Sequence, residues 1–275
     1  MNRLGIRLQL LSAAVLVLLL VAAGSVLLTH RSPHSKAPGF SPLLAGLHKK
    51  GDLKRKERHA AVLAAKTGLP PVPDCDRVPC IALTFDDGPN PLTTPQIVAI
   101  LEAEHVPATF FMVGSRVAGN EALLQRIHAD GDEIGNHSWS HPDLTKLPPD
   151  QVHQQIVGTQ QAIKAAGVPA PKLFRPPYGA VNQTVSDAAK PLTLALWNED
   201  PKDWAAHTPQ QVLASGEAAA QPGGVIDMHD IYHVTANALQ PLIVNLKGRG
   251  FHFVTMSQLM GAQPANGEFY GYAAP

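Results

Sequence analysis

The chain of 275 residues can hold one large domain or two small ones, and its hydrophobic fraction of 45% supplies a sizeable core. Lysine plus arginine and aspartate plus glutamate both number 22, so the formal net charge at pH 7 is zero. This balance excludes the basic field that gathers nucleic acid, and we expect no nucleic-acid partner. The 13 histidines are more informative, because imidazole is a common metal ligand that titrates near neutral pH.

The N-terminus carries an apolar run behind two basic residues, Arg3 and Arg7. Residues 8–28 would span roughly 30 Å as a helix, about one bilayer core. We therefore expect a signal anchor over residues 1–29. A cleaved signal peptide is the alternative, because residues 22–25 are small enough for a processing site. In both cases the basic residues place the N-terminus inside, so the remaining chain is expected to be extracytoplasmic, either membrane-anchored or secreted.

A flexible linker is predicted over residues 30–73, which hold several prolines and a basic stretch at 49–58. We interpret the basic stretch as a solvated spacer, and contact with anionic lipid or wall polymer is the alternative. The folded domain is then expected over residues 74–275. Near its start, Cys75 and Cys80 are the only cysteines. An exported domain favours a disulfide between them, with two free thiols as the alternative, and two cysteines cannot build a four-cysteine zinc site.

From residue 80 onward, short apolar runs alternate with periodic segments of helix length. The predicted strands are 81–85, 109–113, 133–136, 173–175, 192–196, 224–229 and 251–254. The predicted helices lie near 94–105, 116–129, 150–166, 181–190, 208–220 and 235–249. This alternation predicts an α/β fold, a distorted (β/α) barrel of about seven parallel strands with functional residues at the carboxyl ends of the strands.

Two clusters of polar residues at predicted strand ends indicate a metal site. Asp86 and Asp87 end the first strand, and adjacent carboxylates repel each other unless a cation or a proton separates their roles. His137 and His141 follow the third strand at a spacing that lets two imidazoles share one metal. Two histidines and one carboxylate make a three-ligand set that leaves a coordination position open. Each cluster alone could be a solvated turn, but together they favour a metal site.

Three further clusters occupy later strand ends. Arg175 precedes a rigid Pro-Pro-Tyr-Gly turn, residues 197–204 mix acids with two tryptophans, and His229 ends the sixth strand. Taken singly, they are explained by a surface salt bridge, aromatic packing and a core histidine. All five clusters falling at the ends of predicted strands is harder to explain without a common site.

In their order along the chain, these five clusters resemble the motifs of the NodB-type polysaccharide deacetylases, also called carbohydrate esterase family 4. The resemblance covers roughly residues 80–260, and the segments 84–89 and 137–141 carry most of it. It implies a distorted (β/α) barrel and one divalent metal, most often Zn²⁺, with Co²⁺ or Mn²⁺ as alternatives. The metal ligands it implies are Asp87, His137 and His141.

The resemblance also implies the residues that carry out catalysis. Asp86 matches the catalytic base and Arg175 the residue that orients it. His229 matches the general acid and Asp200 the carboxylate that supports it. The remaining roles concern substrate: Tyr178 matches the donor of a backbone N–H to the oxyanion, and Trp204 a wall of the acetyl pocket. His233, four residues beyond His229, is interpreted as incidental.

One position departs from the family pattern, because Asp227 stands where a leucine usually lines the pocket for the acetyl methyl group. A buried carboxylate there is costly unless it is paired or protonated. Three interpretations stay open: an altered acyl pocket, an extra metal or water contact, and weakened catalysis. Asp227 is also the one feature that favours a non-catalytic glycan-binding protein.

We expect a hydrolase that removes N-acetyl groups from cell-wall amino sugars, with peptidoglycan glycan strands as its substrate and partner. The expected anchor and linker would confine the domain to the zone where wall glycan lies. A chitooligosaccharide deacetylase and an acetylxylan esterase are the enzymatic alternatives. The sequence does not distinguish the preferred sugar, the metal or the oligomeric state.

Overall fold

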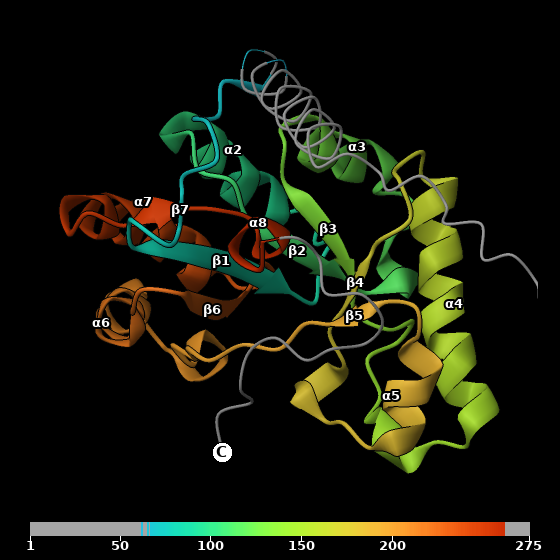
Figure 1. The fold of residues 1–275 in the computed structure, drawn as a ribbon. Coiled ribbons are helices and arrows are strands. Elements are labelled where there is room, and N and C mark those ends of the chain that lie inside the picture. Colours follow the sequence, from blue (N-terminus) through green and yellow to red (C-terminus); the bar gives the residue numbers. More distant parts are fainter. Residues whose placement is uncertain (1–61, 63–64, 66, 262–275) are drawn as a thin grey trace, which may run out of the picture. The chain divides into compact units, whose positions relative to one another are not determined.

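The computed structural model describes Val62, Ala65 and residues 67–261, and within them parallel strands alternate with helices (Figure 1). The strands are β1 (Cys80–Asp86), β2 (Thr109–Met112), β3 (Glu133–Asn136), β4 (Leu173–Phe174), β5 (Thr193–Leu194), β6 (Gly224–His229) and β7 (His252–Phe253). The α-helices are α2 (Thr94–Glu104), α3 (Glu121–Ala129), α4 (Pro149–Ala165), α5 (Gln183–Ala189), α6 (Pro209–Ala219), α7 (His233–Gly248) and α8 (Met256–Leu259). Each predicted strand has its counterpart at nearly the predicted place, and so does each predicted helix except the one over 116–129.

The strands form one seven-stranded sheet in the order β5-β4-β3-β2-β1-β6, with β7 paired to the first residues of β1. All pairings are parallel, so the carboxyl ends of the strands lie at one edge. Beyond β5 the chain continues to β6, where Glu199 forms a parallel bridge with Ile226. The sheet thus curls towards closure, which confirms the predicted distorted (β/α) barrel.

Alternation along β1 and β6 decides which side chains face the barrel interior. Successive residues of a strand point to opposite faces of the sheet. Phe85 and Met228 point outward and join the large apolar cluster that α2, α3 and α7 cover. Thr84 and Asp86 pair in register with Asp227 and His229, on the opposite, inward face. The outer residues therefore hold the helices, and the inner residues supply polar groups.

The helices begin at positions that the sequence marks. In α6, Thr208 accepts a hydrogen bond from the Gln211 N–H, and the Gln211 side chain accepts one from the Thr208 N–H. This capping box satisfies backbone donors that a helix start otherwise leaves unpaired.

The predicted helix over 116–129 is partly wrong. A 3₁₀ turn spans Gly114–Arg116, and α3 begins only at Glu121 because Gly119 takes a φ of 84° that a helix does not allow.

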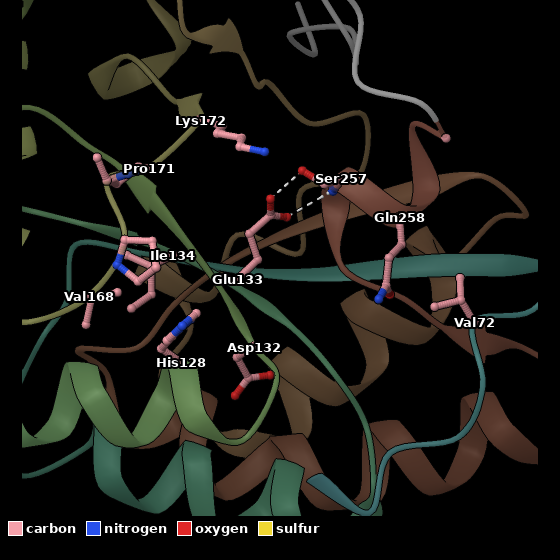
Figure 2. Close-up of a pocket in the computed structure, with 13 residues that line it drawn as sticks. Val72, His128, Asp132, Glu133, Ile134, Val168, Pro171, Lys172, Ser257 and Gln258 are labelled. Carbon is pink, nitrogen blue, oxygen red and sulfur yellow. Dashed lines mark hydrogen bonds between the residues drawn. The ribbon is translucent and has the colours of Figure 1, made fainter. Parts of the chain in front are cut away.

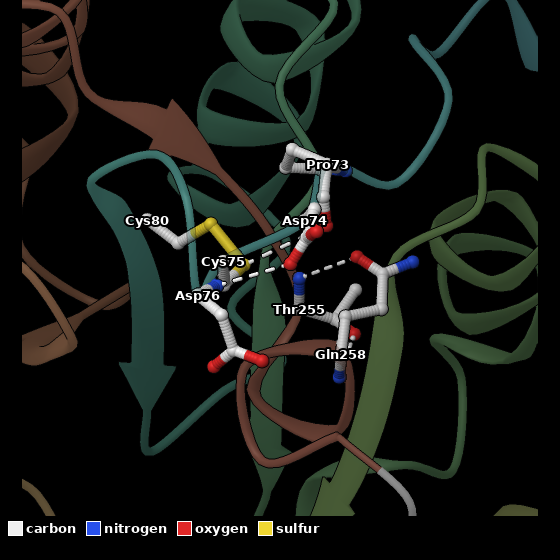
Figure 3. The surroundings of a disulfide bond; sticks show 7 residues. All are labelled: Pro73, Asp74, Cys75, Asp76, Cys80, Thr255 and Gln258. Atoms are coloured by element: carbon white, nitrogen blue, oxygen red, sulfur yellow. Dashed lines mark hydrogen bonds between the residues drawn. A yellow bond between two sulfur atoms is a disulfide. The ribbon is translucent and has the colours of Figure 1, made fainter.

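The disulfide between Cys75 and Cys80 is confirmed, with 5.4 Å between the two Cα atoms (Figure 3). Cys80 begins β1, so the bond ties the segment before the barrel to the start of a central strand. The closed loop is short, with a sequence separation of five. The described part of the chain contains no free cysteine.

The predicted anchor over residues 1–29 lies outside the described residues, as does the predicted linker over 30–73 except for Val62, Ala65 and residues 67–73. None of the helices in the described part has the length and apolarity needed to cross a membrane.

Candidate active site

Three side chains from two strand ends converge as a candidate metal centre. Asp87 follows β1, and His137 and His141 follow β3. Each offers one ligand atom, and these atoms lie within 4.8 Å of one another. The Oδ1 atom of Asp87 is 3.3 Å from Nε2 of His141 and 3.6 Å from Nε2 of His137. The predicted ligands are therefore together, and His233, at the start of α7, is not part of this group.

The protonation and hydrogen bonding of these groups fit a divalent cation. Oδ1 of Asp87 is buried and accepts no hydrogen bond from the described residues, although a buried carboxylate oxygen ordinarily has a partner. Nδ1 of His137 lies 2.7 Å from the Arg175 carbonyl oxygen and, as the N–H donor to it, leaves Nε2 with its lone pair towards Asp87. Burial lowers the pKa of His137 to about 3, so its imidazole is neutral, as a metal ligand must be.

The loops that carry the ligands adopt a backbone conformation that most residues avoid. Asp87, Ser138, His141 and Tyr178 all have positive φ values, between 60° and 73°. Such conformations are costly for residues other than glycine and persist only where surrounding contacts hold them. At this site they turn the chain so that ligands from two strands meet.

The segment between the two histidine ligands is held by a side chain of α4. Oε1 of Gln155 accepts the backbone N–H groups of Trp139 and Ser140, both at 2.9 Å. From the other side, the Gly114 N–H donates to the Ser138 carbonyl. Gln155 was not predicted as a site residue, because a lone glutamine on a helix carries no motif.

Arg175 directly follows β4 and is completely buried. Its Nη1 donates to Oδ1 of Asp86 at 2.8 Å and to Oδ1 of Asp227 at 2.6 Å. The predicted contact between Arg175 and Asp86 is thus present, and Asp227 shares the same guanidinium. Burial raises the pKa of both carboxyl groups, and Arg175 opposes the rise.

The carboxylate beside His229 is Asp203, so the prediction of Asp200 is wrong. Oδ1 of Asp203 lies 2.8 Å from Nδ1 of His229, and its Oδ2 accepts the His229 backbone N–H at 2.7 Å. Asp200 instead accepts the N–H of Lys202 in a surface turn. One sequence signal favours this arrangement, because an Asp-Pro pair such as Asp200-Pro201 is typical of a turn.

The charge of His229 follows from its neighbours. Burial disfavours the charged imidazole, but the hydrogen bond and charge of Asp203, with the charges of Asp227 and Asp86, outweigh it. Together they raise the pKa of His229 to about 10. The imidazole is therefore protonated at neutral pH, with Nδ1–H directed at Asp203.

Two exposed aromatic residues, Tyr178 and Trp204, are neighbours of site residues. The Tyr178 ring meets the His141 ring edge-on, with 4.7 Å between centroids, and Tyr178 is 67% exposed. Trp204 is 56% exposed and directly follows Asp203. Exposed rings beside polar groups are suited to the faces of sugar rings.

A buried acid behind Asp86 and Asp87 was also missed. Oδ2 of Asp230 accepts the Thr94 hydroxyl at 2.6 Å, and a Cβ on Gly88 would lie 2.0 Å from the same oxygen. Burial raises the pKa of Asp230 to about 7. Glycine at position 88 is therefore required for the loop after Asp87 to pack against Asp230.

Comparisons with known proteins agree with this geometry. The family model described as polysaccharide deacetylase matches residues 74–197. A chitooligosaccharide deacetylase of Bradyrhizobium sp. is 37% identical over 196 residues, which cover 65% of this chain and 90% of that protein. The chain belongs to the polysaccharide deacetylase family. The predicted resemblance is confirmed.

Two further similar proteins carry the name peptidoglycan deacetylase. The peptidoglycan-N-acetylglucosamine deacetylase PgdA of Listeria monocytogenes is 38% identical over 76% of this chain, but the match covers only 44% of that protein. The chain thus spans less than half the length of this curated relative. The solved structure of the peptidoglycan deacetylase PdaC from Bacillus subtilis has a TM-score of 0.66 and 41% identity, covering 68% of this chain and 92% of that one.

Proposed function

We propose that this protein is a metal-dependent hydrolase that removes N-acetyl groups from the amino sugars of peptidoglycan. The observation that carries the proposal is the convergence of Asp87, His137 and His141, with Asp86 and His229 in register on neighbouring strands beside them. The names of PgdA and PdaC supply the substrate class. Zn²⁺ is the metal we propose, with Co²⁺ and Mn²⁺ as alternatives, because two imidazoles and one carboxylate suit all three ions.

In this proposal, Asp86 is the base that removes a proton from the attacking water. A divalent metal bound by the three ligands would lower the pKa of that water and polarise the acetyl carbonyl. Arg175 holds Asp86 through its Nη1 and keeps the carboxylate pointed into the site. We assign to the Tyr178 backbone N–H a hydrogen bond to the oxyanion, and to the Trp204 ring a wall of the acetyl pocket.

His229 is the proposed general acid, which gives a proton to the departing nitrogen. Asp203 keeps the imidazole charged and sets its orientation, because it accepts Nδ1–H and leaves Nε2–H for the substrate. Asp203 therefore takes the role that was predicted for Asp200. Amide hydrolysis needs this proton, since an amine leaves poorly without it.

Asp227 belongs to the arrangement around the base. Its carboxylate is 4% exposed and is paired with Arg175, so the cost of burying it is offset by an ion pair and a hydrogen bond. This pairing supports neither an extra metal ligand nor an inactive protein. We propose that Asp227 shares Arg175 with Asp86 and does not bind substrate directly.

The experiment that tests the function is acetate release from purified wall glycan. We expect acetate, loss of the reaction on chelation, and recovery when zinc is added. Mass analysis of the digested glycan then places the missing acetyl group on a particular sugar. Acetate from chitooligosaccharides or acetylated xylan, but not from wall glycan, would replace the proposal with one of those two activities. No acetate from any of the three, despite metal binding, would favour the non-catalytic alternative.

We further propose that residues 1–29 anchor the chain in a membrane, that 30–73 form the linker and that 74–275 form the deacetylase domain. The apolar run at 8–28 supports the anchor. Fractionation of cells producing the full chain tests it. Recovery in the membrane fraction is expected, and a shorter protein in the medium would indicate cleavage.

A further inference from the structure

A small pocket adjoins the candidate active site. Its volume is about 390 Å³, and its walls are Pro89, Asn90, Pro91, Arg116, Ala118, Asn120 and Ile231. Pro89 follows Asp87 by two residues, and Ile231 follows His229 by two residues. The pocket therefore begins where the metal ligands and the proposed acid end, at the carboxyl edge of the sheet.

Arg116 is the one charged residue among the walls of this pocket. Its Nη1 donates to the Asp87 carbonyl, so its guanidinium lies beside the metal-binding loop. No carboxylate of the described residues forms an ion pair with it. Glu121, an acid close in sequence, accepts the Gly119 N–H instead. Within the described part of the chain, the pocket thus presents a positive charge without a carboxylate partner.

The two asparagines of the pocket have groups left over for a ligand. Nδ2 of Asn120 donates to the Arg116 carbonyl, which leaves the Asn120 amide oxygen as an acceptor. Oδ1 of Asn90 accepts the N–H groups of Leu92 and Thr93, which leaves its amide nitrogen as a donor. Proline, alanine and isoleucine supply apolar surface between them. Mixed apolar and polar walls of this kind suit a sugar substituent.

A second pocket at the amino ends of the strands shows the contrast. Figure 2 shows it lined by Asp132, Glu133 and Lys172, among others. Glu133 accepts hydrogen bonds from the backbone N–H and the hydroxyl of Ser257. Acids and a cation occur together there, so the walls have no excess of positive charge. Of these two pockets, the one beside Asp87 combines a guanidinium that has no carboxylate partner among the described residues with closeness to the proposed reaction centre.

We propose that the Arg116 pocket is a subsite for a carboxylate borne by the glycan next to the acetamido group that is cleaved. The inference rests on the proposed function. In muramic acid, a lactyl ether with a carboxyl group stands on the ring carbon beside the one that carries the acetamido group. Arginine recognises carboxylates through paired N–H donors. Chitin has no such charge, so the subsite would direct the enzyme to wall glycan whose lactyl carboxyl groups are free of peptide.

The test compares two substrates on the full chain in detergent. The neutral probe is chitopentaose, and the charged probe is glycan strands stripped of peptide by an amidase, whose lactyl carboxylates are free. For Arg116→Ala we expect the ratio of kcat/KM, charged over neutral, to fall about ten- to a hundredfold, mainly through KM. Arg116→Lys keeps the charge but lacks the paired N–H donors of a guanidinium. Its kcat/KM ratio should lie between those of the wild type and Arg116→Ala. Arg126→Ala is the matched control, because it removes an exposed arginine paired with Glu102.

The ratio separates substrate recognition from support of the Asp87 loop. An equal fall on both substrates, or no change on either, would overturn the subsite. If the wild type released acetate from neither probe, the proposed function would fail instead. Calorimetry of the same two probes with metal-free wild-type and Arg116→Ala protein would then decide the subsite. We expect the charged strands to bind the wild type more tightly than Arg116→Ala. Equal binding of these strands to both proteins would refute the subsite.

Discussion

At the scale of single residues, the site depends on which carboxylate lies against which base. Asp86, Asp227 and Asp203 are all buried. The first two form ion pairs with Arg175, and the third pairs with His229. Arg175 divides its Nη1 between the first two, and His229 takes the third. Exchanging Asp86 for its amide removes the proposed base, whereas exchanging Asp203 removes the hydrogen-bonded partner of His229.

Asp86→Asn should sharply lower turnover and keep the metal. The amide cannot take a proton, and loss of a general base costs roughly 10²–10⁴-fold in kcat. Arg175 retains Asp227 as a partner at 2.6 Å, so the barrel should still fold. Acetate release and a zinc titration measure the two effects. Wild-type turnover by this variant would remove Asp86 from the mechanism.

Asp203→Asn should shift the basic limb of the pH–rate profile to lower pH. Asp203 raises the pKa of His229, which is about 10, so the wild-type acid stays protonated through neutral pH and loses its proton only as pH rises towards that value. Without the charge, the His229 proton should be lost at lower pH, and kcat should fall there first. Asp200→Asn is the matched control and should leave the profile unchanged. A shift with Asp200→Asn alone would reverse the assignment.

At the scale of elements, loops after the strands are held in place by neighbouring helices and by one disulfide. The loop between His137 and His141 is hydrogen-bonded to the Gln155 side chain of α4. The segment before β1 is joined to Cys80, the first residue of β1, by the disulfide from Cys75. Both restraints are local and can be removed without touching the reacting groups.

Gln155→Ala should weaken metal binding, because the backbone of Trp139 and Ser140 loses its acceptor. Loss of a residue that supports metal ligands typically costs 10–100-fold in affinity. Gln155→Glu retains an acceptor oxygen and should restore most of it. A Co²⁺ titration followed by absorbance measures the affinity. Equal affinities for the wild type and the alanine variant would show that Gln155 does not hold the loop.

Reduction of the Cys75–Cys80 bond should lower the free energy of unfolding by roughly 2 kcal/mol, since the loop it closes is short. Denaturant unfolding with and without reductant measures the difference. The variant with both cysteines changed to alanine should match the reduced protein and show no response to reductant.

At the scale of the whole molecule, the two ends of the barrel have different tasks. The carboxyl edge carries the candidate site, whereas the amino edge carries buried acids such as Asp132 without a counterpart in the proposed chemistry (Figure 2). Asp132 accepts the Ala108 N–H at 2.8 Å and is 6% exposed. Burying the ionised Asp132 carboxylate therefore lowers the free energy of unfolding.

The unfolding free energy should therefore decrease as pH rises from about 4 to 8. Burial raises the pKa of Asp132 to about 8, above its ordinary value of 3.8, so the folded state binds a proton that the unfolded state releases. The favourable contribution is complete below the unfolded pKa and is lost as pH rises through the folded one. Asp132→Asn keeps the acceptor for Ala108 and should flatten this part of the profile. Identical pH profiles for the two proteins would contradict the assignment.

The order of strands and helices was largely predictable, because the spacing of apolar residues and the positions of turn residues can be read from short stretches of sequence. The convergence of Asp87, His137 and His141 was predicted by resemblance, with strand ends that share an edge as the physical reason. The helix over 116–129 was predicted too long, because nothing in the period reveals the positive φ of Gly119.

The sequence by itself determined the residues available for the chemistry and the edge of the sheet where they gather. The tertiary structure decided their partners: Asp203 rather than Asp200 for His229, and Arg175 for Asp227, across 26 and 52 residues of chain. The physical reason is that such contacts depend on strand register and on how the chain after β5 returns to β6. No local pattern encodes either of these distances.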